Sequence, residues 1–168
     1  MAMKHQGTIA KRITKYPPQL HEKENLLKRN QEWHSYLDIG SEFNGTVLTR
    51  EEYLRVEQNY VDAVLAFCQT LSCNGLIVNQ LLRLSGDDVD SDSLLLYYSV
   101  AEGDLIKGDD IIKMVRMSLR ENLWCELRCD VNPREYIHFG EDFYMFFYCG
   151  DMSTEFWRKI DALGLYVD

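Results

Sequence analysis

The segment from Thr49 to residue 72 carries the pattern that most constrains how this chain folds. Thr49 is a favoured helix N-cap residue, and Glu51 and Glu52 follow it where the helix dipole favours negative charge. Apolar residues then recur with a period near 3.6: Tyr53, Val56, Tyr60, Val61, Val64, Leu65 and Cys68. We predict a helix over residues 50–72, ended by Asn74-Gly75.

Apolar runs separated by turn residues predict strands in the rest of the chain. They are residues 76–84 (where a buried helix is also compatible), 94–100, 123–129, 136–139, 143–149 and 165–167. The turn at residues 140–142 joins two of them in an antiparallel hairpin. Helical spacing predicts further helices at 21–37, 109–119 and 153–163. The expected class is α+β: N-terminal helices followed by a mainly antiparallel sheet with two helices packed on it.

Length and composition indicate one folded domain. The chain has 168 residues, of which 46% are hydrophobic, enough to form a core. Residues 1–20 are basic and polar and end at Pro17-Pro18, so we expect a flexible basic arm there and a single α+β domain over residues 21–168. No apolar run reaches the roughly 20 residues that cross a bilayer, and no secretory signal pattern occurs. A cytoplasmic location is expected.

The cysteines are predicted to be reduced and buried, because their number is odd and no leader sequence accompanies them. They are Cys68, Cys73, Cys125, Cys129 and Cys149. Four residues separate Cys68 from Cys73, and three separate Cys125 from Cys129, whereas zinc knuckles have two residues between their cysteines. No paired histidine follows either pair. The sequence therefore predicts neither a metal site nor a cofactor.

Negative charge is concentrated in the second half of the chain. Residues 1–84 contain 10 Lys/Arg and 9 Asp/Glu, a balance of +1, whereas residues 85–168 contain 8 and 18, a balance of −10. Such a field repels phosphate backbones and anionic lipid and attracts cationic surfaces. We therefore expect no nucleic-acid or membrane partner, and a basic protein partner is favoured.

Residues 86–93 resemble a calcium-binding loop, because Asp88, Asp90 and Asp92 occupy alternating positions. Ser93 replaces the turn glycine of that motif, and Ser99 stands where its bidentate glutamate belongs. Both differences remove features that calcium coordination needs. The segment is therefore expected to be a solvated acidic loop.

His138, Glu141 and Asp142 lie close enough in sequence to form a general acid–base set or a partial metal site. No third ligand at a suitable spacing is visible, and water screens acidic groups at a hairpin tip. The sequence also lacks a Gly-x-Ser-x-Gly elbow, a phosphate-binding loop, a dinucleotide fingerprint and a His-Glu-x-x-His motif. We expect no catalytic residues; a small enzyme using His138, or a non-catalytic adaptor subunit of a larger assembly, is the alternative.

Aromatic residues crowd the predicted strands of the second half. Because side chains alternate along a strand, only one set within residues 143–149 can fill the core, and the other is available to a helix layer or a partner. An aromatic platform for single-stranded nucleic acid needs a basic groove. Carboxylates surround this one instead: Glu126, Asp130, Glu135, Glu141, Asp142 and Asp151.

Residues 118–127 (SLRENLWCEL) and 136–145 (YIHFGEDFYM) are similar to parts of small bacterial immunity proteins. These proteins are encoded beside polymorphic toxins, including those of contact-dependent growth inhibition systems. The resemblance covers about residues 104–150. It implies a cytoplasmic protein without catalytic residues that binds one cognate toxin domain, often a nuclease, and blocks its active site.

A nuclease active site is cationic because it holds phosphates, so an inhibitor should present carboxylates to it. We expect a monomer or weak homodimer whose acidic loops, together with an aromatic side chain, face the toxin. The candidate partner-binding residues are Asp87, Asp88, Asp90, Asp92, Glu102, Asp104, Asp109, Asp110, Glu141, Asp142 and Tyr144.

Overall fold

The computed structural model describes residues 7–21 and 31–168, and an antiparallel sheet forms its centre. The strands of this sheet are β1 (Ile9–Thr14), β4 (Leu76–Arg83), β5 (Leu105–Ile106), β6 (Leu123–Cys129), β7 (Tyr136–Phe139), β8 (Tyr144–Cys149) and β9 (Tyr166–Val167). They lie in the order β5-β4-β6-β7-β8-β1-β9, and neighbouring strands are antiparallel. A separate small hairpin pairs β2 (Glu42–Phe43) with β3 (Thr46–Val47).

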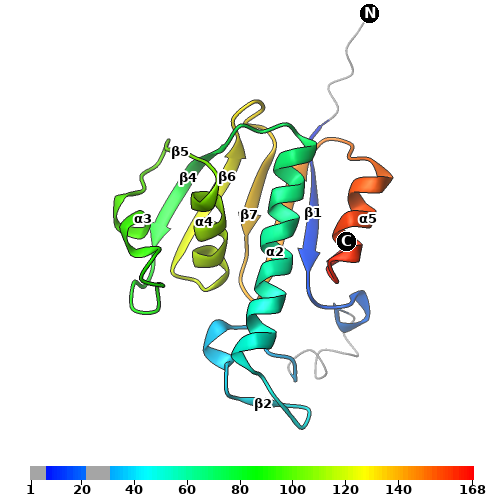
Figure 1. Ribbon diagram of the computed structural model, residues 1–168. Helices are drawn as coiled ribbons and strands as arrows, with labels where there is room; N and C mark the ends of the chain where they lie inside the picture. Colours follow the sequence, from blue (N-terminus) through cyan, green and yellow to red (C-terminus); the bar gives the residue numbers. More distant parts are fainter. Residues whose placement is uncertain (1–6, 22–30) are drawn as a thin grey trace, which may run out of the picture.

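The helices are α2 (Arg50–Thr70), α3 (Leu94–Ser99), α4 (Asp109–Leu119) and α5 (Thr154–Ala162), with short 3-10 turns η1 (Pro18–His21) and η3 (Tyr36–Asp38). Figure 1 shows α2, α4 and α5 on the same face of the sheet. The predicted α+β class is confirmed, with three helices on the sheet instead of two. Among the described residues, no helix is both long and apolar enough to cross a membrane.

Helix α2 begins where the sequence predicts. The Thr49 hydroxyl oxygen accepts the backbone N–H of Glu52 at 3.1 Å, which satisfies one of the donors left free at a helix start. The helix ends at Thr70, two residues earlier than expected. Such a difference is within the normal uncertainty of helix ends.

The core lies between the sheet and its helix layer. The ring centroid of Phe67 on α2 lies 4.6 Å from that of Phe147 on β8, with the rings tilted by 40°, and both side chains are fully buried. Nearer the start of α2, the Tyr60 hydroxyl donates to the Phe143 carbonyl oxygen at 2.6 Å and accepts the Lys15 backbone N–H at 2.7 Å. Helix α2 is thereby fixed to the hairpin tip and to the end of β1.

The predicted flexible arm is wrong for residues 9–20. Strand β1 lies between β8 and β9, and its Ile13 and Thr14 are buried. Side chains alternate between the two faces of a strand, so one face of β1 turns toward the core. On that face Lys11 and Ile13 pair with Phe147 and Met145, whose side chains are buried. The first six residues of the predicted arm lie outside the described residues.

The predicted helix over residues 21–37 is not observed where the structure describes it. Residues 31–35 form turns and bends, and only η3 follows, with the Ser35 hydroxyl and the Asp38 carboxylate forming a capping box. Residues 22–30 of that prediction lie outside the described part of the chain.

The strand predicted over residues 94–100 is wrong, because this run forms helix α3. Tyr97 and Val100, three residues apart, are buried, whereas Leu95 is 81% exposed. The Arg83 guanidinium donates to the Tyr97 carbonyl oxygen at 2.7 Å and also bonds the Val100 carbonyl, so it satisfies the end of the helix. The other predicted helices and strands from residue 50 onward are confirmed, with small differences at their ends.

Candidate functional site

Three segments bring acidic residues to one end of the sheet. The loop after β4, the turn between α4 and β6, and the tip of the β7–β8 hairpin all lie at this end. We call it the acidic end and define it as residues 87–92, Glu121, Glu141 and Asp142. The structure therefore groups the predicted acidic loop with the predicted hairpin tip.

A buried ion pair holds the acidic loop in place. The Arg120 guanidinium donates to both carboxylate oxygens of Glu57, at 2.7 and 2.8 Å, and to Asp90 at 2.8 Å. The side chains of Arg120 and Glu57 are only 3% and 1% exposed, so water screens their attraction little. Burial alone would lower the pKa of Arg120. Hydrogen bonding to Glu57 and the charges of Glu57 and Asp90 together outweigh burial, so the pKa is raised above its ordinary value. Asp90 therefore positions the loop and is not free for a partner.

Glu121, which follows Arg120 in the chain, lies near the hairpin tip. Burial and then the nearby carboxylates of Asp142 and Glu141 raise the pKa of Glu121. Like charges are thus held close together at the acidic end, and a cation placed there would relieve their repulsion. A basic side chain already lies beside the hairpin tip: the Nδ1 atom of His34 is 3.4 Å from Asp142 Oδ1.

Exposed apolar side chains adjoin the acidic loop. Leu95 and Tyr98 on α3 are 81% and 72% exposed, and Leu84 just before the loop is 47% exposed. A Cβ built on Gly86 would lie 3.4 Å from the Tyr98 hydroxyl, which places this ring against the loop. Apolar anchors rimmed by charge are typical of protein-binding surfaces.

The remaining predicted partner-binding residues do not join this group. The Glu102 carboxylate accepts the Leu81 N–H at 2.9 Å, and the Asp104 carboxylate accepts the Ala101 N–H at 2.8 Å, so both organise turns. Asp109 and Asp110 occupy the first turn of α4, near the opposite end of the sheet. Tyr144 lies on the sheet, with its ring 5.7 Å from that of Tyr16.

The possible acid–base set around His138 is not assembled. The His138 ring lies 6.3 Å from the Phe146 ring on the sheet, and its strand neighbour is Glu126. Among the described residues, the buried Nδ1 of His138 has no hydrogen-bond partner, and Asp142 is paired with His34 instead. Geometry therefore gives the enzyme alternative no support.

The sheet face opposite the helices carries the second set of alternating side chains. They include Arg12, Trp124, Glu126, Arg128, Tyr136, His138, Tyr144, Phe146 and Tyr148. Tyr136 and Tyr148 stack with ring centroids 4.3 Å apart, and the Arg128 guanidinium lies 4.3 Å from the Tyr136 centroid. Arg128 is paired with Glu126, and Arg12 with Asp168, so the basic groups of this face are neutralised. This is not the basic groove that single-stranded nucleic acid needs.

Lys15 is a half-buried amine whose position the sequence does not reveal. Its Nζ lies 3.9 Å from the Trp33 ring centroid and 4.2 Å from that of Tyr16, beside a hollow of about 220 Å³. Burial lowers the pKa of Lys15 to about 8, although Glu32, Asp38 and Glu52 act in the opposite direction. The pKa of Lys15 in the folded protein therefore lies well below that of an ordinary lysine.

This shift predicts a pH-dependent stability. In the unfolded chain, lysine titrates near pH 10.4, so between about pH 8 and pH 10.4 the unfolded state binds more protons. The free energy of unfolding of the wild type should rise over this window relative to that of Lys15→Met, in urea titrations at several pH values. The exposed Lys159→Met is the control and should follow the wild type. An unchanged difference between wild type and Lys15→Met would show that Lys15 is not shifted.

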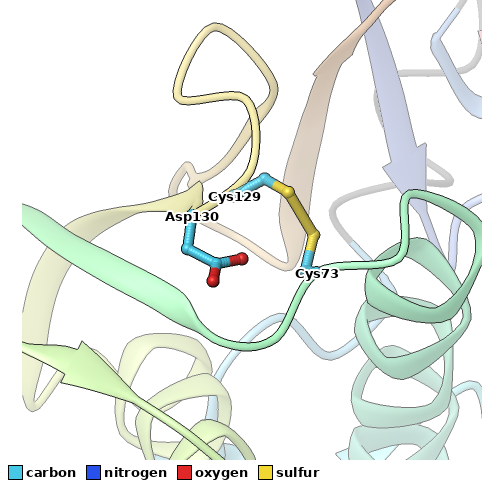
Figure 2. A group of neighbouring side chains, drawn as sticks. All are labelled: Cys73, Cys129 and Asp130. Atoms are coloured by element: carbon cyan, nitrogen blue, oxygen red, sulfur yellow. A yellow bond between two sulfur atoms is a disulfide. The ribbon is translucent and has the colours of Figure 1, made fainter.

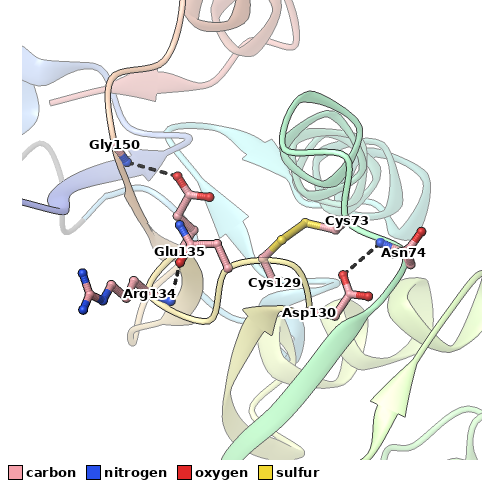
Figure 3. The surroundings of a disulfide bond; sticks show 8 residues. Cys73, Asn74, Cys129, Asp130, Arg134, Glu135 and Gly150 are labelled. Carbon is pink, nitrogen blue, oxygen red and sulfur yellow. Dashed lines mark hydrogen bonds between the residues drawn. A yellow bond between two sulfur atoms is a disulfide. The ribbon is translucent and has the colours of Figure 1, made fainter. Parts of the chain in front are cut away.

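The prediction that every cysteine is reduced is wrong for one pair. Cys73, in the turn after α2, forms a disulfide with Cys129 at the end of β6, with Cα atoms 5.6 Å apart (Figure 3). Cys68, Cys125 and Cys149 are free and buried, as expected. The pairing joins residues 56 apart in sequence, and spacing alone does not identify it.

Comparisons with known protein families, curated proteins and solved structures find no significant match to this chain. The functional assignment therefore depends on the geometry and charge described above.

Proposed function

We propose that this protein is an immunity-type inhibitor that binds a basic toxin domain with nuclease activity. In this proposal the acidic end covers the cationic active site of the toxin and keeps its nucleic-acid substrate out. The inhibitor acts in the cytoplasm, as a monomer or weak homodimer, and needs no catalytic residue or cofactor.

The observation that supports this proposal is the convergence of carboxylates from three separate segments on one end of the sheet. The ion pair of Arg120 with Glu57 and Asp90 fixes the acidic loop, so little ordering entropy of this loop is lost on binding. Exposed Leu95 and Tyr98 beside them provide apolar contact area. Complementary charge of this kind accelerates association by about 10–1000-fold at low salt.

Matched charge variants test which end of the molecule binds. The probe is the C-terminal domain of the exoprotein encoded directly upstream, if that neighbouring gene encodes one, and the association rate is measured at several salt concentrations. Asp88→Asn/Glu141→Gln removes two charges from the acidic end, and Asp109→Asn/Asp110→Asn removes two from the opposite end. We expect the first variant to associate about tenfold more slowly with a shallower salt dependence, and the second to stay close to the wild type.

Equal behaviour of the two variants would exclude the acidic end as the binding surface. Failure of the wild type to bind that domain, or to protect cells that express it, would contradict the proposed function itself. His138→Ala should protect as well as the wild type, whereas an enzyme that depends on His138 would lose activity.

A further inference from the structure

Three potential metal ligands meet at the end of the sheet opposite the acidic end. One atom each from Cys73, Cys129 and Asp130 lies within 4.8 Å of the other two (Figure 2). Cys129 is fully buried at the end of β6, whereas Cys73 is only partly buried. The group is therefore accessible from solvent on one side and anchored in the core on the other. Two thiolates and one carboxylate form a ligand set suited to a thiophilic divalent cation.

We propose that, when the disulfide is reduced, Cys73, Cys129 and Asp130 bind a zinc ion, with water as the fourth ligand. Tetrahedral zinc with bonds of about 2.3 Å to sulfur needs sulfur atoms about 3.8 Å apart. A Cα separation of 5.6 Å allows that spacing through rotation of the two side chains, without movement of the strands. The site thus has two exclusive states, a disulfide and a metal complex.

The backbone around Asp130 prepares this carboxylate for coordination. Backbone N–H groups of the neighbouring turns donate hydrogen bonds to it. One of these is the Asn74 N–H, which donates to Oδ1 at 2.9 Å and ties the carboxylate to the turn that carries Cys73 (Figure 3). This hydrogen bond orients the carboxylate beside both sulfur atoms, as hydrogen bonds usually orient metal ligands.

Conversion of the disulfide into the metal complex requires reduction followed by metal binding. A cellular dithiol supplies two electrons and two protons, so the bond between the sulfur atoms of Cys73 and Cys129 breaks, two thiols form, and the dithiol becomes a disulfide. Zinc binding then displaces the two thiol protons into solvent. In a reducing cytoplasm the cysteine pair is in the thiol state, so the metal complex is the form expected there.

Metal titration of the full chain tests the site. The protein is reduced with a phosphine, desalted without oxygen and titrated with Co²⁺, whose thiolate charge-transfer absorption reports sulfur ligation, and with Zn²⁺ in competition with a chromophoric chelator. We expect one ion per reduced chain and none at this site in the oxidised chain. Zinc should raise the thermal midpoint of the reduced protein and leave that of the oxidised protein unchanged.

Single substitutions assign the ligands. Cys73→Ser and Cys129→Ser should each lose the charge-transfer absorption and tight zinc binding, and Asp130→Asn should bind at least about tenfold more weakly. Cys125→Ala, at a buried cysteine on the same strand, is the matched control and should bind like the wild type.

Three results would overturn the proposal. They are equal zinc binding by oxidised and reduced protein, wild-type binding by Cys73→Ser, and no binding by reduced protein that circular dichroism shows to be folded. If reduction unfolds the chain, zinc must restore the fold, and failure to do so contradicts the site equally. None of these readouts involves the acidic end or a toxin domain.

Discussion

Replacement of Arg120 with methionine is expected to destabilise the folded protein by about 3–5 kcal/mol, the loss typical of breaking one side of a buried ion pair. The variant leaves the Glu57 carboxylate at 1% exposure without its two hydrogen bonds from the guanidinium. It also releases Asp90, so the acidic loop should become more mobile. Urea denaturation followed by circular dichroism measures the change in the free energy of unfolding.

An exposed ion pair on α2, the helix that carries Glu57, is the matched control. Arg55 also forms two hydrogen bonds to a carboxylate, that of Glu52, but these side chains are 62% and 46% exposed. Arg55→Met should therefore change stability by about 1 kcal/mol or less. The double variant Glu57→Met/Arg120→Met should recover much of the loss, because it also removes the buried Glu57 carboxylate. Arg116, whose Nε lies 3.4 Å from Glu57 Oε1, loses that contact, but its side chain is 36% exposed. Equal losses for Arg55→Met and Arg120→Met would show that the buried pair has no special role.

Reduction of the Cys73–Cys129 disulfide is expected to lower the free energy of unfolding by about 2–4 kcal/mol. The bond closes a loop between residues 56 apart, and reopening it returns conformational freedom to the unfolded chain. Urea midpoints of oxidised and reduced protein, measured with a chelator that removes zinc, give the difference.

Cys73→Ser provides the control for direct effects of the reductant. Its stability should be close to that of the reduced wild type and should not change when reductant is added. A reductant effect of the same size in Cys73→Ser and wild type would mean that the disulfide does not contribute the stability.

The central elements of the fold were predictable because local chemistry and burial agree in them. Helix α2 has both an N-cap at Thr49 and a long apolar periodicity, and the β7–β8 hairpin has both alternation and a turn at Gly140. Each of these elements is specified by neighbouring residues. Little information from distant parts of the chain was needed.

Elements whose conformation depends on distant partners were predicted wrongly. Strand β1 contains two cations and becomes a strand because β8 and β9 flank it on both sides. Helix α3 contains an apolar run that is compatible with either structure. Arg83, on β4, completes the end of this helix by binding its carbonyl groups.

The candidate site was predictable only in part for the same reason. Charge counting identifies the loop at residues 87–92 and the hairpin tip, but it does not show that Glu121 lies near the tip carboxylates. Glu57 could have been suspected, since it falls within the apolar stripe of α2 between Tyr53 and Tyr60. Its partner Arg120 is 63 residues away and carried no signal in the sequence.

Hydrogen–deuterium exchange of the protein alone and with the basic toxin domain tests the central claim most directly. The measurement reports which backbone amides become protected when the complex forms. We predict slower exchange at residues 87–92 and 140–143, with no change at residues 130–135 near the disulfide. Protection confined to the disulfide end or to the open face of the sheet, with the acidic end unchanged, would contradict the proposed mode of inhibition.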